Sequence, residues 1–116
     1  MRILAISRLT TAATPEALNA SMEAEVAQGR QFFEQGFIRE GYMDPAYTTA
    51  YLLLDSPSLE DAQATLARYP DTQAGLNTWD LFPLIGLPAI AQSLAAHARP
   101  LPAWWPEVGN TQTDAS

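Results

Sequence analysis

The chain has 116 residues, 13 of them acidic and six basic, and a formal net charge of −7. This balance argues against nucleic acids and anionic membranes as partners. The absence of cysteine from the sequence excludes a disulfide, a thiolate nucleophile and a zinc–cysteine site. No apolar run approaches the roughly 18 residues of a membrane span, and the N-terminus is too short and interrupted for a signal peptide, so we expect a soluble, cytoplasmic protein.

The first two predicted elements are a strand and a long helix. Residues 2–9, RILAISRL, are rich in Ile and Leu in imperfect alternation, which suits a largely buried strand. A helix is predicted over residues 15–36, because Thr14 provides a hydroxyl cap and Pro15 suits the first turn. Gly36 ends this helix as a left-handed cap.

The predicted inward face of this helix carries a carboxylate. At about 100° per residue, Glu25 falls between Met22 and Phe32 on a stripe that also holds Phe33. Burying an ionised carboxyl without a partner is expensive, so Glu25 is either paired or kept there to transfer protons. Gly29 lies on the same face, which predicts a close approach of the helix to the sheet.

The remaining elements follow in regular order. Residues 37–43 and 47–55 predict two strands of a hairpin. Ser58 begins a second helix with a capping box, and Tyr69, the residue before a proline, ends it. Residues 75–84 predict a final strand.

This order, strand–helix–strand–strand–helix–strand, predicts an α+β fold of the ferredoxin-like βαββαβ type. Because such a sheet has helices on one face only, a second copy of the chain is the simplest cover for the other. A third helix over residues 87–98 and a rigid apolar arm over 99–106 are expected to complete one domain, 1–106. We expect this arm to lie against its own domain or a dimer mate, and residues 107–116 to form a disordered tail.

Several short segments resemble those of the muconolactone isomerase-like branch of the dimeric α+β barrel superfamily. They are ILAISRL, TPEAL, the AE of Ala24–Glu25, QGFIRE, LLLDSPSLEDAQATLARYP and AGLNTWDLFPL, which lie between residues 3 and 84. The resemblance implies a dimer whose sheets face each other and a small-molecule pocket beside each sheet. It also implies relatives among cofactor-free isomerases, ring-forming enzymes and cofactor-free monooxygenases of aromatic polyketides.

The same resemblance points to particular residues. Glu25 matches the Glu of the family's first-helix segment, and Arg39 matches the Arg of its second-strand segment. Glu40 and Tyr42 depart from the isomerase pattern. Desolvation raises a carboxyl pKa from about 4.3 toward neutral pH, where a general base works best. The structural alternative is that Glu25 pairs with Arg8, Arg39 or a hydroxyl.

Other side chains are candidates with structural alternatives of their own. Arg39 and Glu40 are expected on opposite faces of their strand, and Arg39 either clamps a carboxylate or enolate-like oxygen or forms an ion pair or dimer contact. Tyr42 and Tyr51 either donate hydrogen bonds in a pocket or pack at a core or interface.

Two further candidates are possible bases. Asp80, beside Trp79, is a candidate base in addition to Glu25. His97, the single histidine, either acts as a base near neutral pH or lies at a helix end or the surface. With one His and no Cys, no transition-metal site is expected, and the scattered acids do not have calcium-loop spacing.

We therefore predict a homodimer, or a higher homo-oligomer, that binds a small hydrophobic substrate without a cofactor. The first interpretation is a cofactor-independent enzyme that isomerises or cyclises a lactone, polyketide or terpenoid-like molecule by proton transfer at Glu25. The alternatives are a cofactor-free monooxygenase of aromatic polyketides and a non-catalytic ligand-binding dimer.

Overall fold

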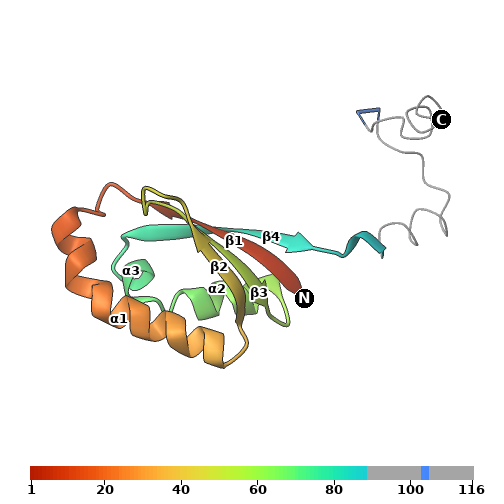
Figure 1. Cartoon of the computed structure of the whole chain (residues 1–116), viewed down its shortest axis with the longest axis horizontal. Coiled ribbons are helices and arrows are strands. Elements are labelled where there is room, and N and C mark those ends of the chain that lie inside the picture. Colours follow the sequence, from red (N-terminus) through yellow and green to blue (C-terminus); the bar gives the residue numbers. More distant parts are fainter. Residues whose placement is uncertain (89–102, 105–116) are drawn as a thin grey trace. The chain divides into compact units, whose positions relative to one another are not determined.

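The computed structural model describes residues 1–88 and 103–104 (Figure 1). Its elements are β1 (Arg2–Leu9), α1 (Pro15–Glu34), β2 (Ile38–Met43), β3 (Ala50–Asp55), α2 (Leu59–Leu66), α3 (Pro70–Gln73) and β4 (Asn77–Leu84). The strands form one antiparallel sheet in the order β2-β3-β1-β4. This confirms the predicted ferredoxin-like α+β fold.

These elements make up one compact unit, Met1–Leu84, and the chain from Ile85 onward is a second unit. The predicted third helix beyond Pro88, His97, most of the apolar arm and the predicted tail lie outside the described residues. No helix within residues 1–88 or 103–104 is long and apolar enough to cross a membrane.

Local sequence signals set the ends of the helices. The Thr14 side chain accepts a hydrogen bond from the Ala17 N–H, at 3.1 Å, and Pro15 occupies the first turn of α1. Gly36 has the predicted left-handed backbone, with φ +79°. Ser58 caps α2 by accepting from the Asp61 N–H at 3.0 Å. Each of these contacts satisfies a backbone group that the helix end leaves free.

The helices cover one face of the sheet (Figure 1). Phe32 of α1 is 0% exposed and is the largest of the fully buried side chains. Its ring meets those of Phe37 and Tyr69 edge to face, at 5.2 and 5.0 Å between centroids. Trp79 of β4 stacks on the other side of Tyr69, at 6.0 Å. This aromatic row joins α1 to the sheet and to the chain between α2 and α3.

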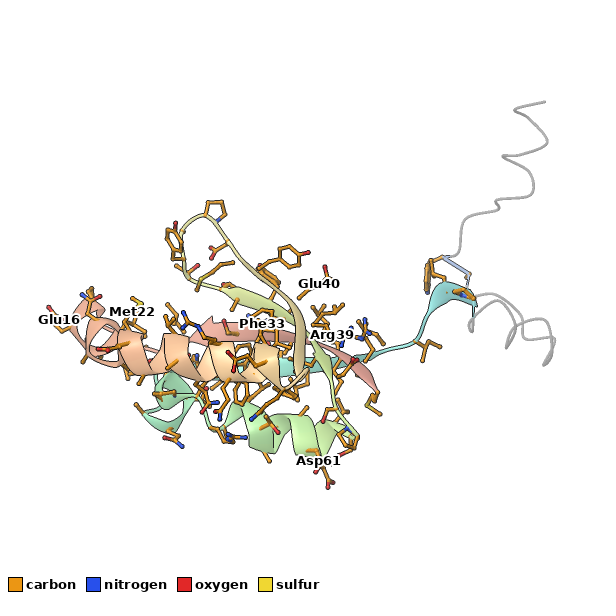
Figure 2. The ribbon with its side chains drawn as sticks, turned by 60° about the horizontal axis from the view of Figure 1, so that its bottom comes forward. Glu16, Met22, Phe33, Arg39, Glu40 and Asp61 are labelled. Atoms are coloured by element: carbon orange, nitrogen blue, oxygen red, sulfur yellow. The ribbon has the colours of Figure 1, made fainter. Side chains whose placement is uncertain are left out.

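Two residues of the predicted inward stripe of α1 are only half covered. Met22 is 53% and Phe33 50% exposed, and both are labelled in Figure 2. Phe33 lies over Gly41 of β2, which is an edge strand, so the sheet covers it on one side only. Met22 lines a cavity.

The second strand carries an irregularity that the sequence does not reveal. The pairing of β2 with β3 shifts between Ile38 and Glu40, so that Glu40 instead of Arg39 is opposite Leu53. The prediction that Arg39 and Glu40 lie on opposite faces is wrong, because a bulge interrupts the alternation of a strand. Both side chains reach the face away from the helices (Figure 2): Arg39 contacts Asp55 there, and Glu40 contacts Tyr42.

The third strand is shorter than predicted, beginning at Ala50 instead of Tyr47. The reason is the turn before it. The Asp44 carboxylate accepts hydrogen bonds from the N–H groups of Thr48 and Thr49, each at 2.8 Å. Tyr47 takes a left-handed backbone, with φ 58°. Side-chain bonds to the nearby backbone compete with strand pairing at such positions.

Candidate functional site

A cavity of about 600 Å³ lies between α1 and the sheet. Its volume is in the usual range for small-molecule sites. Apolar side chains from both layers form most of the wall: Leu9, Leu18, Met22, Val26, Met43, Ala50 and Trp79. The polar groups are Ser7, Glu25, Tyr47, Thr48, Tyr69, Asp71 and Asn77.

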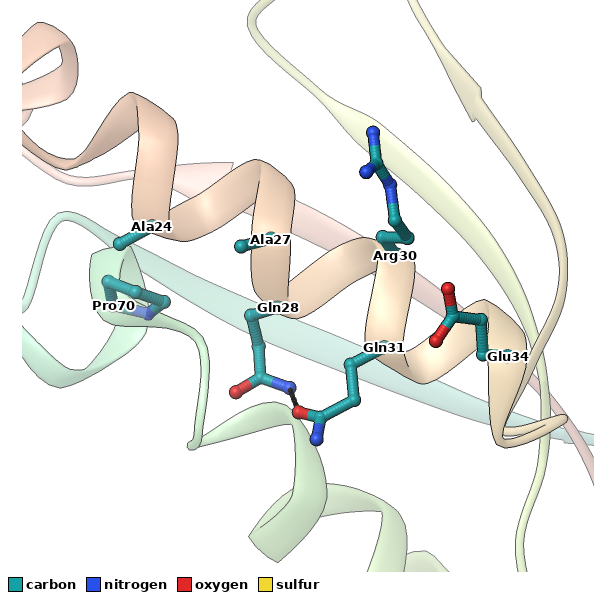
Figure 3. Close-up of a pocket in the computed structure, with 7 residues that line it drawn as sticks. All are labelled: Ala24, Ala27, Gln28, Arg30, Gln31, Glu34 and Pro70. Atoms are coloured by element: carbon teal, nitrogen blue, oxygen red, sulfur yellow. Dashed lines mark hydrogen bonds between the residues drawn. The ribbon is translucent and has the colours of Figure 1, made fainter.

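A second depression lies on the outer side of α1, lined by Ala24, Ala27, Gln28, Arg30, Gln31, Glu34 and Pro70 (Figure 3). It is open to solvent, and its wall is the polar face of one helix. Two of its side chains bind each other, because Gln28 Nε2 donates to Gln31 Oε1 at 2.9 Å. The cavity beneath the helix is less open than this depression and is mainly apolar, and it is therefore the candidate functional site.

Glu25 supplies the central acid of this site. Its Oε1 accepts a hydrogen bond from the Asp71 N–H at 3.0 Å, and no described residue donates to its other oxygen. Burial raises the pKa of Glu25 from its ordinary value of 4.5 to about 7; the Asp71 N–H works against this increase, and the Asp71 charge adds to it. Glu25 is therefore present in both protonation states near neutral pH.

The arginine partners considered for Glu25 lie elsewhere. Arg8 forms an ion pair with Asp80, and Arg39 lies 3.6 Å from Asp55. Within residues 1–88, Glu25 is thus held by a backbone N–H and not by a cation. Because a cation would have lowered its pKa, this partner leaves the carboxyl able to accept or donate a proton near neutral pH.

Asp71 is itself held in place by α1. Its Oδ1 accepts a hydrogen bond from Ser21 Oγ, one helical turn before Glu25. Its carbonyl accepts from the Leu76 N–H at 2.9 Å. Asp71 lies in α3, an element that was not predicted because it begins at Pro70, where α2 was expected to end. Proline suits the first turn of a helix as well as the end of the preceding one.

Tyr69 is the functional candidate that sequence reasoning missed. It was assigned only to the inward stripe of α2, yet the structure places it in the link between α2 and α3, where its side chain lines the cavity. A Cβ added at Gly29 would come within 3.2 Å of its hydroxyl oxygen. The close approach predicted at Gly29 is therefore to Tyr69 and not to the sheet. Burial, aided by the charge of Glu25, raises the pKa of Tyr69 to about 12.

Four other predicted site residues lie away from the cavity. Arg39, Tyr42, Tyr51 and Asp80 are not among its lining residues. Strand register and the contacts of these residues place them on the face of the sheet opposite the helices. There the Tyr42 hydroxyl donates to Glu40 at 2.7 Å, which raises the pKa of Tyr42. The fold thus separates Glu25 from the side chains expected to assist it.

No group of three or more His, Asp or Glu side chains within the described residues is arranged to hold a metal ion. No model of a protein family matches the chain, and no curated protein sequence matches it. Solved structures do share its fold.

One of them is a 5-chloro-2-hydroxyhydroquinone dehydrochlorinase from Burkholderia phenoliruptrix, in complex with 2,5-dihydroxybenzoquinone. It is 15% identical with a TM-score of 0.61, over 77% of this chain and 98% of that chain. Another is muconolactone isomerase, 18% identical with a TM-score of 0.62, over 77% of this chain and 93% of that chain. The structure thus confirms that the chain has the muconolactone isomerase-like fold predicted from its short segments.

Proposed function

We propose that the protein is a small-molecule enzyme that binds a largely apolar compound between α1 and the sheet and transfers a proton with Glu25. The observation that carries this proposal is a carboxyl group in an apolar cavity, held by one backbone N–H and with its pKa raised to about 7. A general base is most effective when its pKa lies near the working pH.

The proposed reaction is an isomerisation or cyclisation that begins beside a carbonyl group. The free oxygen of the Glu25 carboxylate removes a proton from the carbon next to the carbonyl, and the electron pair of that C–H bond moves into the carbonyl as an enolate. Glu25, now protonated, returns the proton to a different carbon. The substrate keeps all its atoms and electrons, and Glu25 ends in its starting state.

The comparisons support this class of reaction. The two similar structures belong to an isomerase and a dehydrochlorinase, both named for small ring compounds. Removal of a proton can begin either a double-bond shift or the loss of chloride. We extend this to a lactone, polyketide or terpenoid-like substrate because the cavity wall is mainly apolar.

We also propose a homodimer formed through the face of the sheet opposite the helices. Tyr51 and Phe82 on this face are 39% and 46% exposed. The helices α1, α2 and α3 lie on the opposite face (Figure 1), so they do not cover the apolar surface of these residues. A second copy would remove this surface from water.

The competing interpretation is a ligand-binding protein in which Glu25 only joins α1 to α3 through the Asp71 N–H. Deuterium exchange distinguishes the two. A panel of uncharged ring ketones and lactones is incubated with the protein in D₂O, and exchange beside the carbonyl is followed by NMR.

We expect Glu25→Gln to lower the exchange rate by about 100-fold or more, the usual contribution of a general base. Glu23→Gln removes a charge from the exposed side of the same helix and is expected to leave the rate unchanged. Exchange that survives Glu25→Gln would refute the catalytic role.

A further inference from the structure

The ionisable side chains that line the cavity are unusual for a site that binds small molecules. Glu25 and Asp71 are acidic, and none of the lining residues is Lys, Arg or His. None of the five arginines of the compact unit lines the cavity; Arg30 lines the other depression, and Arg39 lies beside Asp55. Arg2 and Arg8 form ion pairs with Asp55 and Asp80, and the Arg68 guanidinium lies 5.3 Å from the centre of the Phe32 ring.

A carboxylate or phosphate ligand would therefore meet negative charge and no compensating cation among the described residues. Ligands of this kind are normally bound by Arg or Lys side chains, or by several N–H donors together. Here the Asp71 N–H already donates to Glu25. The electrostatics of the cavity thus disfavour an anionic ligand, and its mainly apolar wall favours an uncharged one.

Tyr69 offers such a ligand a hydrogen-bond donor. The residue is only 7% exposed, yet its hydroxyl makes no hydrogen bond to any other described residue. Every fully buried side-chain oxygen or nitrogen of the described residues has a partner, so the Tyr69 hydroxyl must reach the surface of the cavity. A tyrosine hydroxyl at such a surface is available to donate to an acceptor oxygen of a bound ligand.

The surrounding residues hold this hydroxyl in position. The Tyr69 ring is packed between Phe32 and Trp79, and the missing side chain of Gly29 leaves room for the hydroxyl. Trp79 Nε1 is already engaged, because it donates to Thr72 Oγ1 at 3.0 Å. The indole therefore contributes a flat apolar wall and Tyr69 contributes the donor.

We propose that the cavity selects uncharged, largely apolar compounds whose carbonyl or phenolic oxygen accepts a hydrogen bond from Tyr69, and that it rejects carboxylates. The inference deepens the proposed function and rests on it in one respect: the carbon that loses its proton to Glu25 would lie near this oxygen. In that arrangement Tyr69 stabilises the enolate oxygen as Glu25 removes the proton.

The test uses three naphthalene probes that differ in one group. The first, 6-acetyl-2-dimethylaminonaphthalene, is an uncharged ketone whose emission moves to longer wavelength when its carbonyl accepts a hydrogen bond. The second carries a carboxylate in place of the acetyl group, and the third, 2-dimethylaminonaphthalene, has neither. Binding to the full chain is measured by fluorescence titration at about pH 8.5, where Glu25 is ionised.

We expect the ketone to bind at least about 10-fold more tightly than the carboxylate, because like charges repel in the cavity. Tyr69→Phe keeps the ring and removes the hydroxyl. It is expected to weaken ketone binding about 3- to 10-fold, the effect of one hydrogen bond, and to move the bound emission to shorter wavelength. Binding of the probe without an acceptor should not change. Tyr42→Phe, on the opposite face of the sheet, is the matched control.

Three results would overturn the inference: no binding of the ketone, equal binding of ketone and carboxylate, or a ketone complex whose affinity and emission are unchanged by Tyr69→Phe. A melting curve verifies that Tyr69→Phe remains folded. Glu25→Gln separates this inference from the proposed function. Deuterium exchange that survives Glu25→Gln, with a normal response to Tyr69→Phe, refutes the catalytic role alone. Deuterium exchange that is lost in Glu25→Gln, together with ketone binding that does not respond to Tyr69→Phe, refutes only the role of Tyr69.

Discussion

Replacing Glu25 by Gln is expected to stabilise the protein above neutral pH. The pKa of Glu25 is 4.5 in its ordinary environment and about 7 in the fold. Between these two pH values the folded state binds more protons than the unfolded chain, so this group lowers the stability as the pH rises through that range. Below about pH 4.5 both states are protonated and the group has no effect. Above about pH 7 its destabilising effect is complete.

The size of the effect follows from the same two values. A pKa raised from 4.5 to about 7 corresponds to about 3 kcal/mol between the two protonation states. Glu25 is only partly buried, and solvent screening reduces this to about 1–2 kcal/mol. The Gln oxygen can still accept from the Asp71 N–H, so the variant removes the charge and keeps the contact. For a domain of this size, that gain raises Tm by about 5–10 °C.

The measurement is urea unfolding of the wild type and of Glu25→Gln at several pH values from about 4.5 to 8.5. Asp44 and Asp55 have lowered pKa values and favour the folded state as the pH rises through their own range, below that of Glu25. Both proteins contain Asp44 and Asp55, so the effect of these two residues cancels in the difference between the two free energies of unfolding. We expect this difference to grow from near zero to its full size across neutral pH, and Glu23→Gln to show no such growth. A difference in the free energy of unfolding between the wild type and Glu25→Gln that stays constant with pH would refute the reasoning.

Three other substitutions test the packing around the site. Phe32→Ala is expected to cost about 3–5 kcal/mol in urea unfolding, because the ring is fully buried against Tyr69; a loss below about 1 kcal/mol would contradict this packing. Thr14→Ala should cost about 1 kcal/mol by loss of the α1 cap, and Thr14→Ser should restore most of it. Gly29→Ala gains about 1 kcal/mol of helix propensity but crowds the Tyr69 hydroxyl. We expect it to weaken binding of the ketone probe even where melting shows no loss of stability.

Much of the fold could be predicted because its signals are local. The hydroxyl of Thr14, the ring of Pro15 and the free backbone of Gly36 act within a turn of their own positions, so the ends of α1 are visible in the sequence. The apolar spacing of α1 likewise identified Phe32 as a core residue and Glu25 as an inward acid. The predicted element order then led to the βαββαβ topology.

The predictions that were wrong concern features whose causes are not local in the sequence. The bulge at Ile38 and Glu40 depends on the pairing of β2 with β3, and no residue of β2 signals it. It leaves Arg39 and Glu40 on the same face, where Arg39 lies beside Asp55 and away from Glu25. The start of β3 at Ala50 was missed because the Asp44 carboxylate binds the backbone of the turn before it.

For the candidate site, the sequence by itself determined that an acid lies on the buried side of a long helix. It could not decide what that acid meets, because its partner, the Asp71 N–H, is 46 residues away in the chain. Nor could it show that the Tyr69 hydroxyl lies against Gly29 in the cavity. Helix spacing fixes the direction of a side chain relative to its own axis, whereas burial, charge and hydrogen-bond partners depend on the other elements that pack against it. The tertiary structure alone decided that Glu25 is held by a backbone donor with no cation beside it among the described residues. Burial, against the effect of that donor, raises its pKa to about 7, and the two observations together are the basis of its proposed role.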